Sequence, residues 1–337
     1  MRRGITPLRV AGGAFLGVVA TLLILYLVPS DKFILLPDVA HPVAPLVKVQ
    51  NARPTTGSGT LYFVDVVERR ANELEALFPW LRPRASLEPA GAIVPPCATD
   101  AEAQAAALQE MAFSQRVAAA VALRRLGYHV VVKPTGVVVS QLFAGTHAPC
   151  NLQPMDVILS VDGKRSPTIA RLHAILARVT PGAFITLRLR RGDRVLTQKI
   201  RTVRNAAEPG QAFIGISADQ AAKIRLPLRV SIDASGIGGP SAGLAFALEV
   251  MQKLGRNVLR GHDVAATGEM ELNGTVAPIG GVKQKTYGVR QAGADVFLVP
   301  AGSNAQVARR YAGHVRIIPV STFNQALHAL ATLPPAQ

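Results

Sequence analysis

The chain has 337 residues, of which 49% are hydrophobic and 17% are charged, so it can bury a sizeable core and is not globally disordered. Basic residues exceed acidic residues by 37 − 21 = 16, which favours anionic partners, but only 5% of residues are aromatic, so a base-stacking platform and a nucleic-acid partner are not expected. Two cysteines are too few for a disulfide scaffold or a cysteine-built zinc site, and neither HExxH nor GxxxxGK[ST] occurs. We therefore expect no metal and no cofactor.

The N-terminal segment predicts a membrane anchor. Residues 10–28 are 19 consecutive residues without a charge. A helix of that length spans about 28 Å, close to the hydrocarbon thickness of a bilayer. Because arginines precede this segment, the positive-inside rule makes residues 1–9 a cytoplasmic tail and places the rest of this single-pass protein of the cell membrane outside the cytoplasm. A cleaved signal peptide is the competing interpretation, but its apolar region should be shorter and end in an A-x-A-like site.

Residues 29–127 read as a linker and membrane-proximal region. Residues 29–60 are rich in Pro, Val, Thr and Gly and are expected to be an extended linker, followed by a strand over 61–67. Whether that strand is the first strand of the C-terminal domain stays open. Thr99 and Glu102 form a capping box, which predicts a helix from there to about Leu126.

The two cysteines lie on either side of this predicted helix. Outside the cytoplasm the compartment is oxidising, so Cys97 and Cys150 are free to form a disulfide. Two isolated structural cysteines are the alternative, and the sequence leaves both open.

Short strands, turns and one helix are predicted from 128 to 204. Their order resembles a PDZ domain of the bacterial protease-associated kind. The matching residues are Gly145-Thr146-His147-Ala148, Leu152, Asp156-Val157-Ile158, Asp162-Gly163 and Pro181-Gly182. Met155 stands where that family usually has glycine. The resemblance implies a groove that binds an extended peptide substrate as an added strand, and a spacer domain with a closed groove is the alternative.

Strands and helices alternate again from 205 to 337, so the whole chain is expected to be α+β. Asn273-Gly274 predicts a two-residue hairpin turn. A Gly-rich loop places Ser241 immediately before a predicted helix, whose free N–H groups suit an oxyanion. A serine needs a base to take its proton, and Lys285 follows a Gly-Gly turn. A lysine acts as a base only when desolvation lowers its pKa.

These motifs resemble the proteolytic domain of the Lon family. The matching segments are GGPSAGLAFALE, TGE and NGTVAPIGGVKQK, in the same order and spacing. The resemblance implies a nucleophile at Ser241 and a general base at Lys285, with Thr267 supporting the lysine. It also implies an oxyanion-binding loop, formed here by Gly239, Pro240 and Ala242.

Two neighbouring residues bear on how the resemblance is used. Lys283 and Lys285 point to nearly opposite helix faces, so we expect Lys283 to be a solvated surface charge. Gly238 replaces an acidic residue that is common in the ATP-dependent members.

Anchor, PDZ-like domain and proteolytic domain together resemble the membrane-anchored, ATP-independent members of the family. This implies a serine endopeptidase that acts on extracytoplasmic proteins or peptides. A homo-oligomer is left open. A catalytically silent PDZ scaffold at the cell envelope is the first alternative. An α/β-hydrolase esterase is the second, because Gly239–Gly243 reads G-x-S-x-G and acids and histidines follow in chain order: Asp263, Asp295, His314 and His328.

Overall fold

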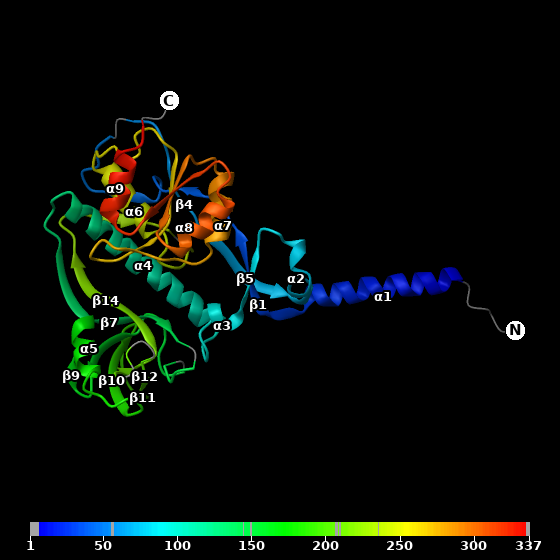
Figure 1. Ribbon diagram of the computed structural model, residues 1–337, viewed down its shortest axis with the longest axis horizontal. Coiled ribbons are helices and arrows are strands. Elements are labelled where there is room, and N and C mark those ends of the chain that lie inside the picture. The colour runs from blue at the N-terminus through cyan, green and yellow to red at the C-terminus, as the bar shows by residue number, and fades with distance from the viewer. Residues whose placement is uncertain are drawn as a thin grey trace.

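The computed structural model describes residues 7–334 apart from 55–56, 144, 149, 206–207, 209 and 235, and describes side chains from Ala11 onward. Figure 1 shows a long N-terminal helix, α1 (Pro7–Leu27), pointing away from the rest of the chain. Within the described residues no helix has both the length and the apolarity to cross a membrane. The anchor predicted for residues 10–28 is therefore not confirmed.

Residues 29–60 are not the extended linker that their composition predicts. A three-stranded antiparallel sheet follows α1 in the order β5-β1-β6, made of β1 (Pro29–Pro37), β5 (Val66–Asn72) and β6 (Ser86–Pro89). The prolines of β1 lie at its two ends, where they leave the ladder intact. Between them Phe33, Ile34 and Leu35 are buried, and burial of each such side chain stabilises the fold by about 2 kcal/mol.

Short elements and one long helix complete the region between α1 and the β-rich middle of the chain. They are α2 (Glu73–Leu77), the 3-10 helix η1 (Pro79–Leu81), α3 (Ala90–Ile93) and α4 (Asp100–Arg125). The predicted capping box is present: the N–H of Glu102 donates to Oγ1 of Thr99 at 3.2 Å, and the N–H of Thr99 donates to the Glu102 carboxylate at 2.8 Å. Helix α4 packs along α6 of the C-terminal domain, so it belongs to that core rather than to a linker.

The middle of the chain forms a separate β-rich unit with its own core. Its sheet has the order β11-β10-β8-β7-β14, with β9 beside β8, and helix α5 packs on β7 and β14. The elements are β7 (Val131–Leu142), β8 (Val157–Val161), β9 (Lys164–Arg165), α5 (Ile169–Leu176), β10 (Phe184–Arg191), β11 (Arg194–Arg201), β12 (Val203–Arg204), β13 (Ala212–Phe213) and β14 (Ile216–Arg225). This is the strand and helix order that the sequence predicts for a PDZ-like domain, extended by the long strand β14.

Met155 takes a backbone conformation that usually belongs to glycine. Its φ is +68°, in the left-handed region, at the turn where the resembling domains have glycine. The turn thus has the backbone conformation expected for glycine although Met155 occupies this position. The N–H of Met155 donates to the carbonyl of Val139.

The C-terminal domain is built on a five-stranded sheet of order β2-β4-β16-β19-β20. Its last four strands are parallel, and β4 comes from far upstream in the chain. The PDZ-like unit is thus inserted between the first and the remaining parallel strands. The strands are β2 (His41–Pro42), β4 (Leu61–Phe63), β16 (Val264–Ala266), β19 (Val296–Pro300) and β20 (Arg316–Val320). Two smaller pairs are formed by β3 (Val47–Val49) with β15 (Val230–Ile232), and by β17 (Glu269–Met270) with β18 (Val276–Ala277).

Helices cover both faces of this sheet. The residues of β19 alternate, so that Val296 and Leu298 share a core with α6 and α9, while Phe297 and Val299 share one with α7 and α8. The helices are α6 (Gly243–Lys253), α7 (Val282–Gln291), α8 (Ser303–Tyr311) and α9 (Phe323–Ala331). The mixed α+β class is confirmed.

Candidate active site

Ser241 lies in the loop that enters α6, at the carboxyl end of β16. The N–H of Gly268 donates to the carbonyl of Ser241 at 2.8 Å, and the hydroxyl of Thr267 donates to the same carbonyl at 3.1 Å. Both partners directly follow β16. The carboxyl end of a parallel strand, where helices from the two faces meet, is the usual place for a site in such sheets.

Helix α4 holds the other side of the same loop. The N–H of Gly239 donates to the carbonyl of Ala107 at 2.8 Å, and the hydroxyl of Ser114 donates to the carbonyl of Pro240 at 2.9 Å. Gly238 has no room for a side chain, because a Cβ there would lie 2.8 Å from Cβ of Ala107. This close packing explains why glycine suits position 238.

Lys285 reaches Ser241 from the opposite face of the sheet. It sits near the start of α7. Gly281, the residue before this helix, has the left-handed backbone conformation. The Nζ of Lys285 lies 2.5 Å from Oγ of Ser241 and 3.4 Å from Oγ1 of Thr267. The structure therefore brings the three predicted residues together. Since the Thr267 hydroxyl donates to Ser241, its oxygen is left to accept from Nζ and to orient it.

Burial lowers the pKa of Lys285 to about 8, because the ammonium loses its hydration. Its side chain is only 4% exposed. The negative charges of Asp65 and Glu68 act in the opposite direction and raise that pKa. Burial in turn raises the pKa of both carboxyl groups. A substantial fraction of Lys285 is consequently neutral slightly above neutral pH.

Asp65 is a site residue that sequence reasoning missed. It follows the parallel strand β4, the neighbour of β16, so the two strands end side by side and Asp65 comes close to the dyad. Its Oδ1 is buried without a hydrogen-bond partner. Only the pairing of β4 with β16 reveals this proximity, and no local pattern in the sequence signals it.

Ser114 is the second missed residue. It lies on the buried stripe of α4 with Met111, Val117, Ala118 and Val121. A hydroxyl in an otherwise apolar helix stripe was the available signal, because buried polar groups need a partner.

The oxyanion loop differs in part from the prediction. Pro240 has no N–H to donate, and the N–H of Gly239 is already bonded to Ala107. Ala242 occupies the N-cap of α6, and an N-cap N–H makes no bond within its helix. Of the three predicted residues, Ala242 is therefore the one suited to stabilise an oxyanion.

Lys283 is not the solvated charge that was predicted. Its Nζ donates to the carbonyls of Ala85 at 2.8 Å and Pro83 at 3.3 Å, so it secures the segment before β6. The helix geometry correctly predicts that Lys283 points away from Ser241. It does not predict that residues 83–85 pack against that face of α7.

The acids and histidines of the esterase interpretation are not brought to Ser241. Asp263, Asp295 and His314 precede the parallel strands β16, β19 and β20, so they lie at the amino ends of the sheet, opposite the dyad. Asp263 accepts instead from the N–H of Thr60 at 2.7 Å. His328 lies on α9 and lines a cavity with Arg256 and Leu126, away from Ser241. The geometry does not form a Ser-His-Asp triad.

One group among the described residues has the side chains of a metal site. Ligand atoms of Asp38, His41 and Asp65 lie within 4.8 Å of one another. Nε2 of His41 lies 3.6 Å from the Asp38 carboxylate, and Asp65 interacts electrostatically with Lys285. The nearby Asp38 carboxylate adds to burial in raising the pKa of Asp65.

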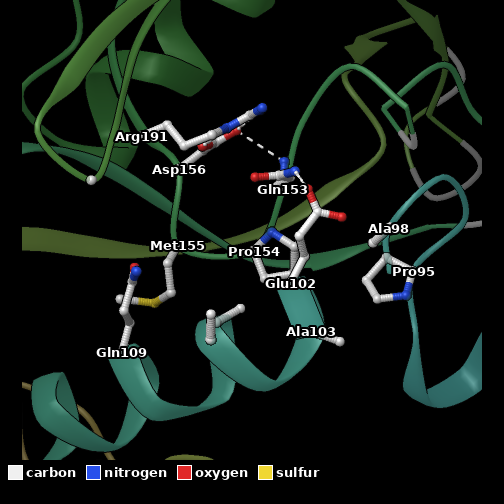
Figure 2. Close-up of a pocket in the computed structure, with 13 residues that line it drawn as sticks. Pro95, Ala98, Glu102, Ala103, Gln109, Gln153, Pro154, Met155, Asp156 and Arg191 are labelled. Carbon is white, nitrogen blue, oxygen red and sulfur yellow. Dashed lines mark hydrogen bonds and ion pairs between the residues drawn. The ribbon is translucent and has the colours of Figure 1, made fainter. Parts of the chain in front are cut away.

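The two cysteines are bonded to each other, 53 residues apart in the chain. The bond ties the turn before α4 to a loop of the PDZ-like domain. A cavity of about 110 Å³ lies between α4 and the PDZ-like domain (Figure 2). In it, Nε2 of Gln153 donates a hydrogen bond to the carboxylate of Glu102 on α4. At its far side Arg191 forms an ion pair with Asp156 at 2.7 Å.

The C-terminal part of the chain is similar to known proteins. A family model described as the Lon protease (S16) C-terminal proteolytic domain matches residues 196–332. Lon protease 1 of Sorangium cellulosum is 34% identical over 127 residues, which cover 35% of this chain and 15% of that protein. Lon protease 2 of Bacillus subtilis is 36% identical over 101 residues, covering 30% of this chain and 18% of that protein. The matches thus span less than a fifth of these relatives.

Solved structures of PDZ domains match about a quarter of this chain. The PDZ domain of the SdrC-like protein from Listeria monocytogenes is 20% identical, covers 25% of this chain and 87% of its own, and has a TM-score of 0.23. The PDZ domain of the SdrC-like protein from Listeria innocua is 19% identical, with coverages of 25% and 92% and the same TM-score.

Proposed function

We propose that this protein is a serine endopeptidase that hydrolyses peptide bonds through a Ser241–Lys285 dyad, without ATP. The Lon (S16) proteolytic domain is a serine-type peptidase domain. The observation that carries the proposal is the 2.5 Å approach of Nζ of Lys285 to Oγ of Ser241 in a buried setting.

The geometry supports a course in two halves. Neutral Lys285 accepts the proton of the Ser241 hydroxyl while Oγ attacks the carbonyl carbon of the scissile bond. The N–H of Ala242 then stabilises the oxyanion. Lys285 returns its proton to the leaving amine, and an acyl-enzyme remains on Ser241. Water attacks this ester with Lys285 again as the base, which releases the second product and restores Ser241.

Cleavage by matched variants tests this proposal. An unfolded protein substrate without nucleotide is offered to the wild type, Ser241→Ala and Lys285→Ala. The exposed pair Ser231→Ala and Lys48→Ala on β15 and β3 serves as the control. We expect both dyad variants to lose at least about a thousandfold in rate, because a dyad acts as a unit, and both controls to keep the wild-type rate. A wild type that cleaves nothing favours the silent scaffold, and loss with Ser241→Ala alone places the base elsewhere.

The PDZ-like domain is proposed to present the substrate as an added strand. Strand β14 ends the order of its sheet, and among the described residues it pairs only with β7, with α5 packed nearby. The same strand leads through β15 toward Ser241, so a peptide on its free edge is directed to the dyad. In the Ser241→Ala protein, bound substrate should slow amide hydrogen exchange in residues 216–225. Slower exchange elsewhere, with β14 unchanged, contradicts this arrangement.

Attachment to a membrane is also proposed, with the catalytic domain outside the cytoplasm. The uncharged run over residues 10–28 and the preceding arginines support it. So does α1, where every described residue from Ala11 to Ile24 is exposed. The full-length chain should remain in the membrane fraction after alkaline extraction and be digested by protease added outside the cell. Release by alkali contradicts it.

A further inference from the structure

Three large apolar side chains are exposed within five residues of the membrane-proximal region. Leu77, Trp80 and Leu81, at the end of α2 and in η1, are 55%, 67% and 53% exposed. We call them the Trp80 patch. Phe78 supports the indole ring edge-on, with ring centroids 5.1 Å apart. Soluble surfaces seldom gather such residues without an apolar partner.

Helix α2, which leads into the patch, packs on the end of α1. The N–H of Glu73, the first residue of α2, donates to the carbonyl of Val28 at 3.0 Å. Figure 1 shows α2 next to the C-terminal end of α1 and apart from the helices and sheets of the larger domains. Along α1 the exposed apolar surface continues through Leu23, Ile24 and Leu27. The exposed apolar surface of α1 thus continues up to the contact of α1 with α2, the helix that ends in the Trp80 patch.

Arginines border the patch. Arg82 is exposed and bonds Glu75 together with Arg69, at 3.5 and 2.7 Å. Arg84 is exposed and places its guanidinium 5.5 Å from the ring centroid of Tyr287. Tryptophan favours the boundary between lipid chains and headgroups, and arginine favours the adjoining phosphates.

The patch is held firmly to the catalytic domain. Lys283 donates to the carbonyls of Pro83 and Ala85, and Nε2 of Gln284 donates to Oγ of Ser86 at 2.7 Å. Both residues adjoin Lys285 on α7. A surface that binds the Trp80 patch therefore also fixes the distance of the dyad from that surface.

We propose that the Trp80 patch inserts into the headgroup region of a lipid bilayer on the side where the catalytic domain lies. The inference rests on the proposed membrane attachment of the N-terminal segment. The occupant is the lipid interface itself, argued from the continuity of the patch with α1 and from its arginine border. Docking of another protein is the alternative outcome of the test.

Trp80 is the single tryptophan of the chain, so intrinsic tryptophan fluorescence reports on this patch alone. The full-length chain is placed in vesicles of phosphatidylcholine and phosphatidylglycerol in equal parts, and flotation shows whether it is bound. We expect phosphatidylcholine brominated near the headgroup end of its chains to quench the emission roughly twofold, as for an interfacial tryptophan. Iodide in the water should quench it little.

Two variants make the test specific. Leu81→Glu should restore quenching by iodide and lose quenching by the brominated lipid, since a carboxylate resists insertion. Val195→Glu replaces an equally exposed apolar residue of β11, 50% exposed, and should leave both unchanged. A chain that floats with the vesicles while iodide reaches Trp80 freely overturns the inference and leaves attachment standing. A chain that does not float overturns both the inference and the membrane attachment. The cleavage rates of the wild type and of the Ser241 and Lys285 variants test only the peptidase proposal.

Discussion

The chemistry of Ser241 depends on the charge of one lysine. Burial lowers the pKa of Lys285, while the carboxylates of Asp65 and Glu68 oppose that shift. The result, about 8, places the lysine near the pH at which it can both take and return a proton.

The first prediction concerns the pH dependence of kcat/KM. Below a pH of about 8 the buried lysine carries its proton and cannot act as a base. The rate should therefore rise with pH, about tenfold per unit well below the pKa, and level off above it. Steady-state cleavage of a peptide over this range measures the profile. A rate that is flat from acid to alkaline pH would exclude Lys285 as the base.

The second prediction concerns Asp65. Asp65→Asn removes a negative charge that favours the ammonium form, so the pKa of Lys285 should fall and the rising limb should move to lower pH by up to about one unit. Asp31→Asn, at an exposed position in β1, serves as the matched control and should leave the limb in place. A limb that moves to higher pH would mean that Asp65 does not act through its charge.

Among the elements, α4 has the most direct effect on the catalytic loop, because it bonds the two residues before Ser241. Ser114→Ala removes the donor to the carbonyl of Pro240 and leaves that carbonyl unsatisfied. We expect a loss of about 1–2 kcal/mol in unfolding free energy. We also expect kcat to fall about tenfold with little change in KM, since the displaced loop misaligns Oγ. Arg116→Ala, exposed on the same helix, is the control. A reduced stability with unchanged kcat would assign Ser114 a purely structural role.

At this scale the sequence predicts what is local. The capping box at Thr99 and the Gly-Gly entry to α7 give these helices their correct starts, because each signal lies within one turn. A hairpin is formed around Asn273-Gly274, but residues 271–275 separate its paired strands β17 and β18, so the predicted two-residue turn is wrong in length. Ser241 and Lys285 were predicted through their motifs, whereas Asp65 was not, because its place follows from strand pairing far apart in the chain.

The wrong predictions concern residues that other parts of the chain bury. Composition made residues 29–60 a linker, yet Phe33 to Leu35 form a buried strand whose prolines lie only at its ends. The helix face predicts a solvated Lys283, yet the segment at 83–85 lies against it and supplies carbonyl acceptors for its Nζ. In both cases the missing information was which surface another part of the chain covers.

Considered as a whole, the molecule joins its PDZ-like and catalytic domains through α4. The Cys97–Cys150 bond fixes the start of this helix to the PDZ-like domain and closes a loop of 53 residues. Replacing both cysteines by serine should lower the free energy of unfolding by about 4 kcal/mol by the loop-entropy estimate. Denaturant unfolding of the variant and the wild type, both without reductant, measures it. Equal midpoints would show that the bond does not constrain the chain.

Mass spectrometry of the chain after treatment with a fluorophosphonate tests the central claim most directly, because this reagent phosphonylates an activated serine. At a pH above about 8, where Lys285 is largely neutral, we predict one adduct, located on the peptide that contains Ser241. The adduct should be absent from Lys285→Ala and present in Lys48→Ala. An adduct that forms equally in Lys285→Ala, or on another serine, would contradict the dyad.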